Sequence, residues 1–325
     1  MATKFEGLNN NPIVDDINDV KTDTSLNVED VTEQISDVPR TPTDPNKIHV
    51  NVNDRRAPIV LLFGAPSSGK TMTLVRLAKY LKGKGYMLKI DENFVTTRDV
   101  WEYEENSKGF NKMLGTTTAL GGTNRNDFLF VKVVDSHGKI ICQILEGAGE
   151  DYFPMNGENR VEASFPSYMD GVFGTTNKKV WIFITEPNWK VNKSDKIDYV
   201  NRIAWCKNQY FNRNDKAIIL YNKIDRVPEL LYGQGQVHVK SAMEYCNNEY
   251  SDSTERGTDG ITIFNIFKNP SPLAGLLFPK YLCKFVPFCT GKYSEALKRE
   301  EQHYTLSHPS YPAALWETIM DCIKS

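Results

Sequence analysis

The sequence predicts an α/β fold, a doubly wound and mostly parallel sheet with flanking helices. Three observations support this prediction. Apolar runs of strand length alternate with segments whose apolar residues recur at helical spacing. The first apolar run leads directly into a glycine-rich loop, residues 64–71, and a helical pattern follows that loop. Polar motifs follow the ends of later runs, which is expected where parallel strands present their carboxyl ends at one edge.

Each predicted strand is an apolar run bounded by polar or turn-forming residues. Buried strands are predicted at residues 58–63, 179–185 and 216–221 because these runs are apolar throughout. Residues 127–135 and 139–145 predict a hairpin, since the segment between them supplies a turn. A last strand is expected at residues 281–288.

The predicted helices lie between these strands and after the last of them. Apolar residues at helical spacing or compatible sequence place helices at residues 72–81, around 161–172, at 196–211 and at 311–323.

Composition separates an acidic segment from the rest of the chain. The 325 residues are 40% hydrophobic and 25% charged, with a net charge of −2. Residues 1–54 hold eleven acidic residues and four lysines or arginines, a net charge of −7. We expect residues 1–56 to be a disordered acidic tail, since they are too polar to form a core. A short helix at residues 25–34 is the alternative.

One domain is expected to follow this tail. It spans residues 57–325, with insertions at about 82–114, 151–178 and 227–280. The insertions are candidate partner surfaces, or they cover the sheet edge. The near-zero net charge of the chain argues against a protein built to coat nucleic acid, so no nucleic-acid partner is expected.

The glycine-rich loop has the pattern GxxxxGK[ST] between a predicted strand and a predicted helix. In this context the backbone amides of such a loop surround phosphate groups, and the helix N-terminus adds a favourable dipole. Lys70 would contact the β- and γ-phosphates, and the Thr71 hydroxyl would bind Mg²⁺. The alternative is a loop that merely caps a helix. The candidate nucleotide-binding residues are Gly64, Ser67, Ser68, Gly69, Lys70 and Thr71.

A second motif follows the predicted strand at residues 216–221. It reads Asn222, Lys223, Ile224, Asp225. A carboxylate at such a strand end can accept hydrogen bonds from N1–H and the exocyclic amine of guanine, whereas adenine offers no such pair of donors. The alternative is a strand that ends in a polar turn.

With both motifs in this order, the chain resembles the P-loop GTPases of the Ras-like and translation-factor (TRAFAC) class, as a diverged bacterial member. The resemblance covers residues 58–292 and implies the P-loop NTPase fold. It implies that Asp225 binds the base, that Asn222 braces the loop, and that the stem of Lys223 packs along the ring. Cys289, Thr290, Gly291 and Lys292 resemble the element whose amides meet guanine O6, with Thr290 and Gly291 as candidate contacts.

The resemblance also implies a metal and catalytic set. Gly149 matches the glycine whose amide meets the γ-phosphate, and Glu146 stands where the family has an aspartate near Mg²⁺. Glu150 replaces a glutamine that often positions water, which places hydrolysis in doubt. Thr123 is the expected switch threonine and a metal ligand, with Thr116, Thr117 and Thr118 as competitors. Arg125 is a candidate arginine finger.

The resulting hypothesis is a Mg²⁺-dependent switch that binds GTP and GDP, with slow or partner-assisted hydrolysis. Lys70, Thr123, Gly149 and Glu150 would be its catalytic residues, and a protein effector or activating partner would bind the switch loops and insertions. Two alternatives stay open, a non-hydrolysing GTPase-like binding or scaffold module and an ATP-dependent phosphotransferase.

Two further features concern the compartment. The six cysteines lie in apolar surroundings and read as reduced thiols. No membrane-spanning run or signal-peptide core is found in the sequence, so a cytoplasmic protein is expected.

Overall fold

The computed structural model describes residues 41–116, 128–231, 236–251, 261–293 and 304–325. The chain divides into two compact units, Met1–Thr41 and Pro42–Ser325. Nearly all of the first unit lies outside the described residues, so the disorder expected of residues 1–40 stays a prediction. The second unit begins earlier than the expected domain start at residue 57. The physical reason is apolar burial, because Ile48 and Val52 belong to the core.

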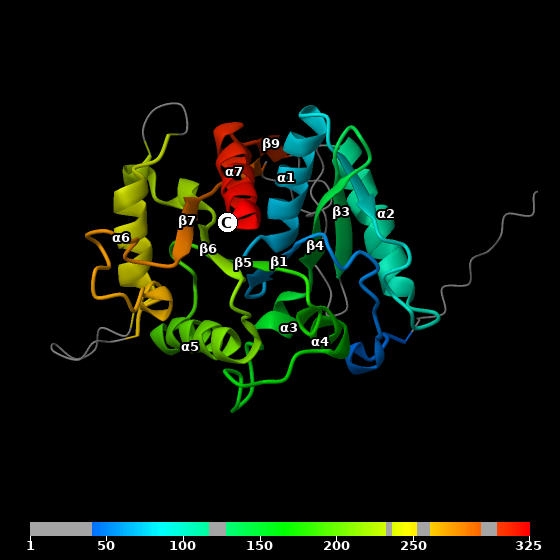
Figure 1. Cartoon of the computed structure of the whole chain (residues 1–325), viewed down its shortest axis with the longest axis horizontal. Coiled ribbons are helices and arrows are strands. Elements are labelled where there is room, and N and C mark those ends of the chain that lie inside the picture. The colour runs from blue at the N-terminus through cyan, green and yellow to red at the C-terminus, as the bar shows by residue number, and fades with distance from the viewer. Residues whose placement is uncertain (1–40, 117–127, 232–235, 252–260, 294–303) are drawn as a thin grey trace, which may run out of the picture. The chain divides into compact units, whose positions relative to one another are not determined.

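Seven strands form one sheet in the order β2-β3-β4-β1-β5-β6-β7 (Figure 1). Strand β3 pairs antiparallel with both β2 and β4, and the strands from β4 through β7 run parallel. The predicted mostly parallel α/β sheet is therefore confirmed. The strands are β1 (Ile59–Gly64), β2 (Met87–Ile90), β3 (Leu129–Val134), β4 (Ile140–Glu146), β5 (Lys179–Thr185), β6 (Lys216–Tyr221) and β7 (Cys283–Pro287).

Helices cover both faces of the sheet, which explains why its central strands are apolar throughout. Figure 1 shows α1 and α7 on one face and α3, α4 and α5 on the other. Helix α2 packs beside α1, and α6 packs near the edge strand β7. The helices are α1 (Lys70–Gly83), α2 (Trp101–Gly115), α3 (Gly149–Tyr152), α4 (Ser167–Phe173), α5 (Lys193–Tyr210), α6 (Val239–Glu249) and α7 (Ser310–Lys324).

The segments expected as insertions form specific elements. Residues 82–114 contribute β2 at the sheet edge and nearly all of α2. Residues 151–178 include α4, which begins later than the helix expected around residue 161. Pro166 precedes its first residue, and the ring of a proline disfavours helical geometry in the residue before it. Residues 227–280 include α6 and a short 3-10 turn, Asn265–Phe267.

The remaining elements lie near the C-terminus. Strands β8 (Gly291–Tyr293) and β9 (Tyr304–Leu306) form a separate antiparallel pair. All six cysteines are free thiols, as predicted. None of the helices within the described ranges is long and apolar enough to span a bilayer.

A buried arginine ties the segment after α3 to helix α5. The Arg202 guanidinium donates to the carbonyl oxygens of Tyr152 and Val161, both at 3.0 Å, and to that of Ala163 at 2.5 Å. The guanidinium carbon Cζ of Arg202 lies 4.1 Å from the centre of the Phe165 ring. Burial lowers the pKa of Arg202 to about 10, so the side chain stays charged at neutral pH.

Arg202→Met is expected to lower the free energy of unfolding by about 3 kcal/mol or more, because it leaves three carbonyls without their donor. Urea denaturation measures this change. Arg213→Met, at an exposed position, is the matched control and should change stability by less than about 0.5 kcal/mol. Equal stability of the two variants would contradict the structural role of Arg202.

Candidate functional site

The glycine-rich loop connects β1 to α1 at the carboxyl end of the sheet. Helix α1 begins at Lys70, and Gly69 before it has φ +90°. A Cβ atom on Gly69 would lie 2.5 Å from Nδ2 of Asn222. The position therefore requires glycine both for its backbone angle and for the approach of the neighbouring loop. Ser67 also adopts a positive φ of 60°.

Lys70 is buried and turned back onto its own loop. Its Nζ donates to the carbonyl oxygens of Gly64 at 3.1 Å and Ala65 at 3.3 Å. Burial lowers the pKa of Lys70 to about 8, and the nearby carboxylates of Glu146, Glu150 and Asp151 oppose this shift. The amine is therefore mostly protonated at pH 7, in a place where an anion would stabilise its charge further.

This pKa predicts how anion binding depends on pH. If a polyphosphate raises the pKa of Lys70, binding favours the protonated amine, so affinity is constant below the pKa of the free protein and falls above it. With a free pKa of about 8, the dissociation constant should rise about tenfold between pH 7 and pH 9. Titration calorimetry with GDP measures it. A flat profile would show that Lys70 does not take up a proton on binding, and Lys70→Met supplies the control because it removes the titrating group.

Two of the three expected metal ligands, Thr71 and Glu146, lie together. The hydroxyl of Thr71 donates to Oε1 of Glu146 at 2.8 Å. Parallel pairing of β1 with β4 positions them, since Glu146 ends β4 beside β1. The described residues contain no cluster of three or more His, Cys, Asp or Glu that could hold a metal. Two protein oxygens are nonetheless sufficient for Mg²⁺ when nucleotide phosphates and water complete its coordination.

Gly149 lies directly against the glycine-rich loop. It begins α3, and a Cβ atom there would lie 2.4 Å from both Cα and N of Pro66. These are backbone atoms, so no larger residue fits without separating the two loops. Glu150, the next residue, is exposed. Asp151 is buried and accepts a hydrogen bond from the Tyr168 hydroxyl at 2.8 Å.

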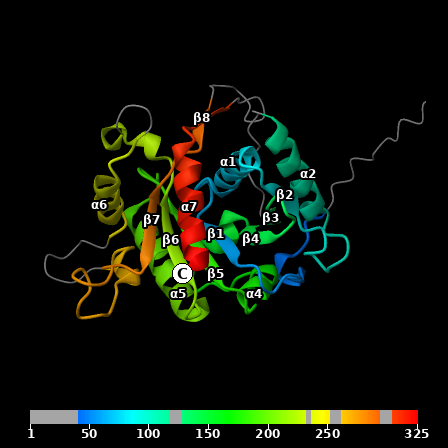
Figure 2. The same ribbon diagram turned by 45° about the horizontal axis from the view of Figure 1, so that its top comes forward.

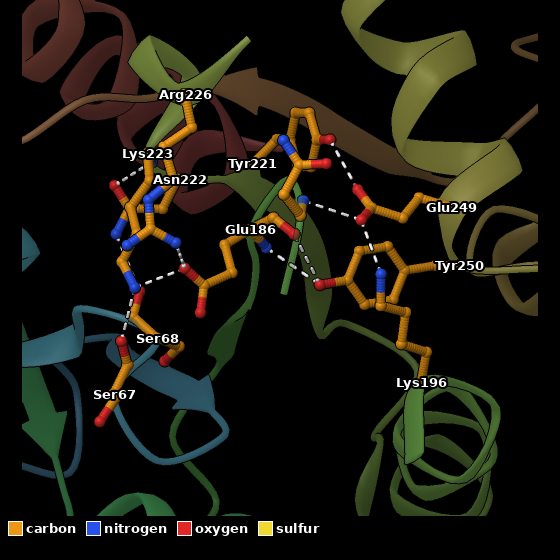
Figure 3. A network of polar contacts seen from close by, with 11 residues as sticks. Ser67, Ser68, Glu186, Lys196, Tyr221, Asn222, Lys223, Arg226, Glu249 and Tyr250 are labelled. Carbon is orange, nitrogen blue, oxygen red and sulfur yellow. Dashed lines mark hydrogen bonds and ion pairs between the residues drawn. The ribbon is translucent and has the colours of Figure 1, made fainter. Parts of the chain in front are cut away.

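The loop at residues 222–225 also meets the glycine-rich loop (Figure 3). Asn222 Nδ2 donates to the carbonyl oxygen of Ser68 at 2.9 Å, and Lys223 Nζ donates to that of Ser67 at 2.7 Å. Asn222 Oδ1 accepts from the backbone amide of Lys223 at 2.8 Å. Two sequence motifs more than 150 residues apart therefore share a direct contact.

Asp225 is joined to the loop that follows β7. The Cys289 thiol donates to Oδ1 of Asp225 at 3.1 Å. Burial and this hydrogen bond raise the pKa of Cys289 to about 12, so the thiol is protonated and can donate. The backbone continues into Thr290, which is buried, and Gly291, which begins β8. Thr290 and Gly291 therefore directly follow the residue that contacts Asp225.

Glu186 is a residue of the site that the sequence analysis missed. Its buried carboxylate forms ion pairs with Lys223 and with Arg226, the latter at 2.9 Å. Its backbone amide donates to the Tyr250 hydroxyl at 3.1 Å, and that hydroxyl donates to its carbonyl oxygen at 2.9 Å (Figure 3). The available signal was an acidic residue immediately after the buried strand β5.

This network extends from the loop at residues 222–225 to the insertion that contains α6. Glu249, the last residue of α6, accepts hydrogen bonds from Tyr221 at 3.0 Å and Lys196 at 2.7 Å. Tyr250 follows it and holds the backbone of Glu186. The end of α6 therefore supports both β6 and the residue after β5.

Some predicted residues cannot be placed. Thr123, Thr117, Thr118 and Arg125 lie outside the described residues, so their roles stay predictions. Thr116 is described, and its carbonyl oxygen accepts a hydrogen bond from Lys79. The structure brings the glycine-rich loop, Glu146, Gly149, Asn222 and Lys223 together, and the roles predicted for these residues stay predictions.

The chain matches known proteins in structure but not in sequence. No protein-family model matches the chain, and no curated protein matches it. Among solved structures, 51 chains match. One is a Plasmodium falciparum protein described as nucleolar GTP-binding protein 1, which is 12% identical with a TM-score of 0.38. The match covers 85% of this chain and 90% of that one. A similarity of this size supports no inference about function.

Proposed function

We propose that this chain binds a guanine nucleotide with Mg²⁺ and acts as a nucleotide-dependent switch. The observation that carries the proposal is the contact between the two loops, in which Asn222 and Lys223 bond to the carbonyls of Ser68 and Ser67. A loop suited to phosphate and a loop suited to guanine are thereby held side by side, at the carboxyl edge of the sheet.

The phosphate half of the proposal rests on α1 and its loop. The backbone amides near Gly69 and the N-terminus of this 14-residue helix attract an anion. Lys70 would leave the carbonyls of Gly64 and Ala65 and turn toward the β- and γ-phosphates. Thr71 and Glu146 would ligate Mg²⁺, Glu146 directly or through water, and the ion would neutralise charge on the phosphates.

The base half rests on Asp225 and the residues around it. Its carboxylate would exchange the thiol of Cys289 for N1–H and the exocyclic amine of guanine. The stem of Lys223 would lie along the ring, held at its charged end by Glu186 and by Ser67. Amides near Thr290 and Gly291 would meet O6.

The switch rests on Gly149. Its contact with the backbone at Pro66 places the loop after β4 beside the phosphate-binding loop. A γ-phosphate between these loops would have to move them apart or bond to both, which couples the nucleotide to the position of α3 and Glu150. Thr123 would complete the sensor. Hydrolysis would be slow or partner-assisted, because Glu150 stands in place of the glutamine that often positions the attacking water.

The competing function with a specific observation in its favour is a binding module without turnover. The exposed carboxylate of Glu150 would repel a γ-phosphate, and it cannot perform the function of the glutamine amide that often positions water. An ATP-dependent phosphotransferase is the weaker alternative. It gives the loop at residues 222–225 no part in recognising the base, so the contacts of Asn222 and Lys223 with the glycine-rich loop would serve the fold alone.

The switch is tested by hydrogen exchange of the full chain with GDP or with a non-hydrolysable GTP analogue. We expect the analogue to change protection at residues 146–152 and in the glycine-rich loop. Identical exchange in the two states would contradict a switch. Phosphate release from GTP over hours then separates slow hydrolysis from a module that only binds.

A further inference from the structure

The loop at residues 269–282, called here the apolar loop, presents large apolar side chains to solvent. It follows the 3-10 turn Asn265–Phe267 and leads into the edge strand β7 (orange in Figure 2). Leu276 is 83% exposed, Leu277 is 74% exposed and Phe278 is 52% exposed. Leu273 and Leu282 are also exposed. Single exposed leucines are common on protein surfaces, whereas consecutive exposed apolar side chains of this size indicate an interaction surface.

The backbone amides at the tip of the apolar loop, residues 273–278, donate hydrogen bonds within the loop. The amides of Leu276, Leu277 and Phe278 all donate to the carbonyl oxygen of Leu273, at 3.1, 3.1 and 3.4 Å. The amide of Gly275 donates to the carbonyl oxygen of Phe278 at 2.8 Å. Those of Leu273 and Ala274 donate to the hydroxyl and carbonyl oxygens of Ser271. These hydrogen bonds remove the cost of burying the amides, while the carbonyl oxygens can stay hydrated if the tip enters no deeper than the headgroup boundary.

The base of the apolar loop is closed and basic. Asn269 donates to the carbonyl oxygens of Lys280 and Pro279, both at 2.9 Å, which holds the two ends together. Three exposed lysines lie around it in sequence: Lys268, Lys280 and Lys284. No aspartate or glutamate occurs in residues 261–291. An apolar tip flanked in sequence by lysines and no acidic residue is complementary to a surface with an apolar interior and negative headgroups.

We propose that the apolar loop inserts its tip into the headgroup boundary of an anionic lipid bilayer. Leu276, Leu277 and Phe278 would enter the acyl region, and the lysines would contact lipid phosphates and carboxylates. The hydrogen-bonded amides favour this partner over a protein strand, since the tip offers few free amide donors for pairing. The proposal uses residues outside the nucleotide site and does not depend on the proposed function.

The test is flotation of the full chain with vesicles of phosphatidylcholine containing about 30% phosphatidylserine. The native chain should float with these vesicles and not with pure phosphatidylcholine. The double variant Leu276→Ser/Leu277→Ser should lower vesicle affinity at least about tenfold. Val239→Ser is the matched control, because Val239 is a 52% exposed apolar residue on α6, outside the apolar loop. Circular dichroism confirms folding of each variant.

Three outcomes would overturn the proposal. The first is native protein that does not float. The second is a double variant that floats as well as Val239→Ser. The third is a dimer seen by light scattering that the double variant dissociates, since a second copy would then cover the loop. Lys268→Glu/Lys280→Glu provides an independent check and should abolish the dependence on phosphatidylserine while leaving folding unchanged.

Discussion

Asp225→Asn is expected to reduce GTP and GDP affinity at least about a hundredfold and to create affinity for xanthine nucleotides. An asparagine cannot accept both guanine donors, and its amide would face the exocyclic amine. Xanthine carries a carbonyl at that position, so the amide can donate to it while the asparagine oxygen accepts from N1–H. Displacement of a fluorescent nucleotide by GDP and by XDP measures both changes.

The control for this variant is Glu229→Gln. Glu229 is exposed in the turn Pro228–Leu230, close to Asp225 in sequence. Its replacement removes one negative charge from the same region and should leave the preference for guanine unchanged. If Asp225→Asn loses GDP without gaining XDP, then Asp225 supports the loop through Cys289 and does not recognise the base.

Lys70→Met is expected to reduce nucleotide affinity by about a hundredfold or more, since it removes a charge-assisted contact to phosphate. The nucleotide-free protein should lose no more than about 2 kcal/mol of stability, because the loss of the donor to the carbonyls of Gly64 and Ala65 is partly offset by removal of a buried charge. The downward shift of the Lys70 pKa has burial as its largest cause, which indicates that the folded chain disfavours this charge when no anion is present.

The matched control is Lys82→Met on the exposed surface of the same helix. It should bind nucleotide as the native chain does. Affinity is measured by calorimetry and stability by urea denaturation. A Lys70→Met chain that unfolds in the absence of nucleotide would assign Lys70 to the fold, and one that binds normally would remove it from the site.

Burial on both faces explains which parts of the fold could be predicted. Strands β5 and β6 have the predicted bounds because every position packs against a helix or another strand, so the apolar run has no interruption. Edge elements lack this signal. Strand β2 alternates between exposed and half-buried residues, and residues 261–267 bury Ile263, Phe264 and Phe267 without joining the seven-stranded sheet.

The candidate site divides in the same way. The glycine-rich loop and residues 222–225 have local patterns, since each needs particular residue types at fixed spacing. The ion pair of Glu186 with Lys223 has no such pattern, because it depends on how β5 and β6 are paired. The hydrogen bond between Cys289 and Asp225 likewise depends on the neighbouring position of β7. Contacts between strand ends become visible only when the sheet order is known.

One site is proposed to hold a nucleotide and to select guanine. Its most direct measurement is an equilibrium competition on the purified full chain, in which GDP, GTP and ATP displace a fluorescent GDP in the presence of Mg²⁺. We expect GDP and GTP to displace the probe and ATP to require at least about a hundredfold higher concentration. Displacement by ATP at the same concentration as GDP, or no binding of the probe, would contradict it.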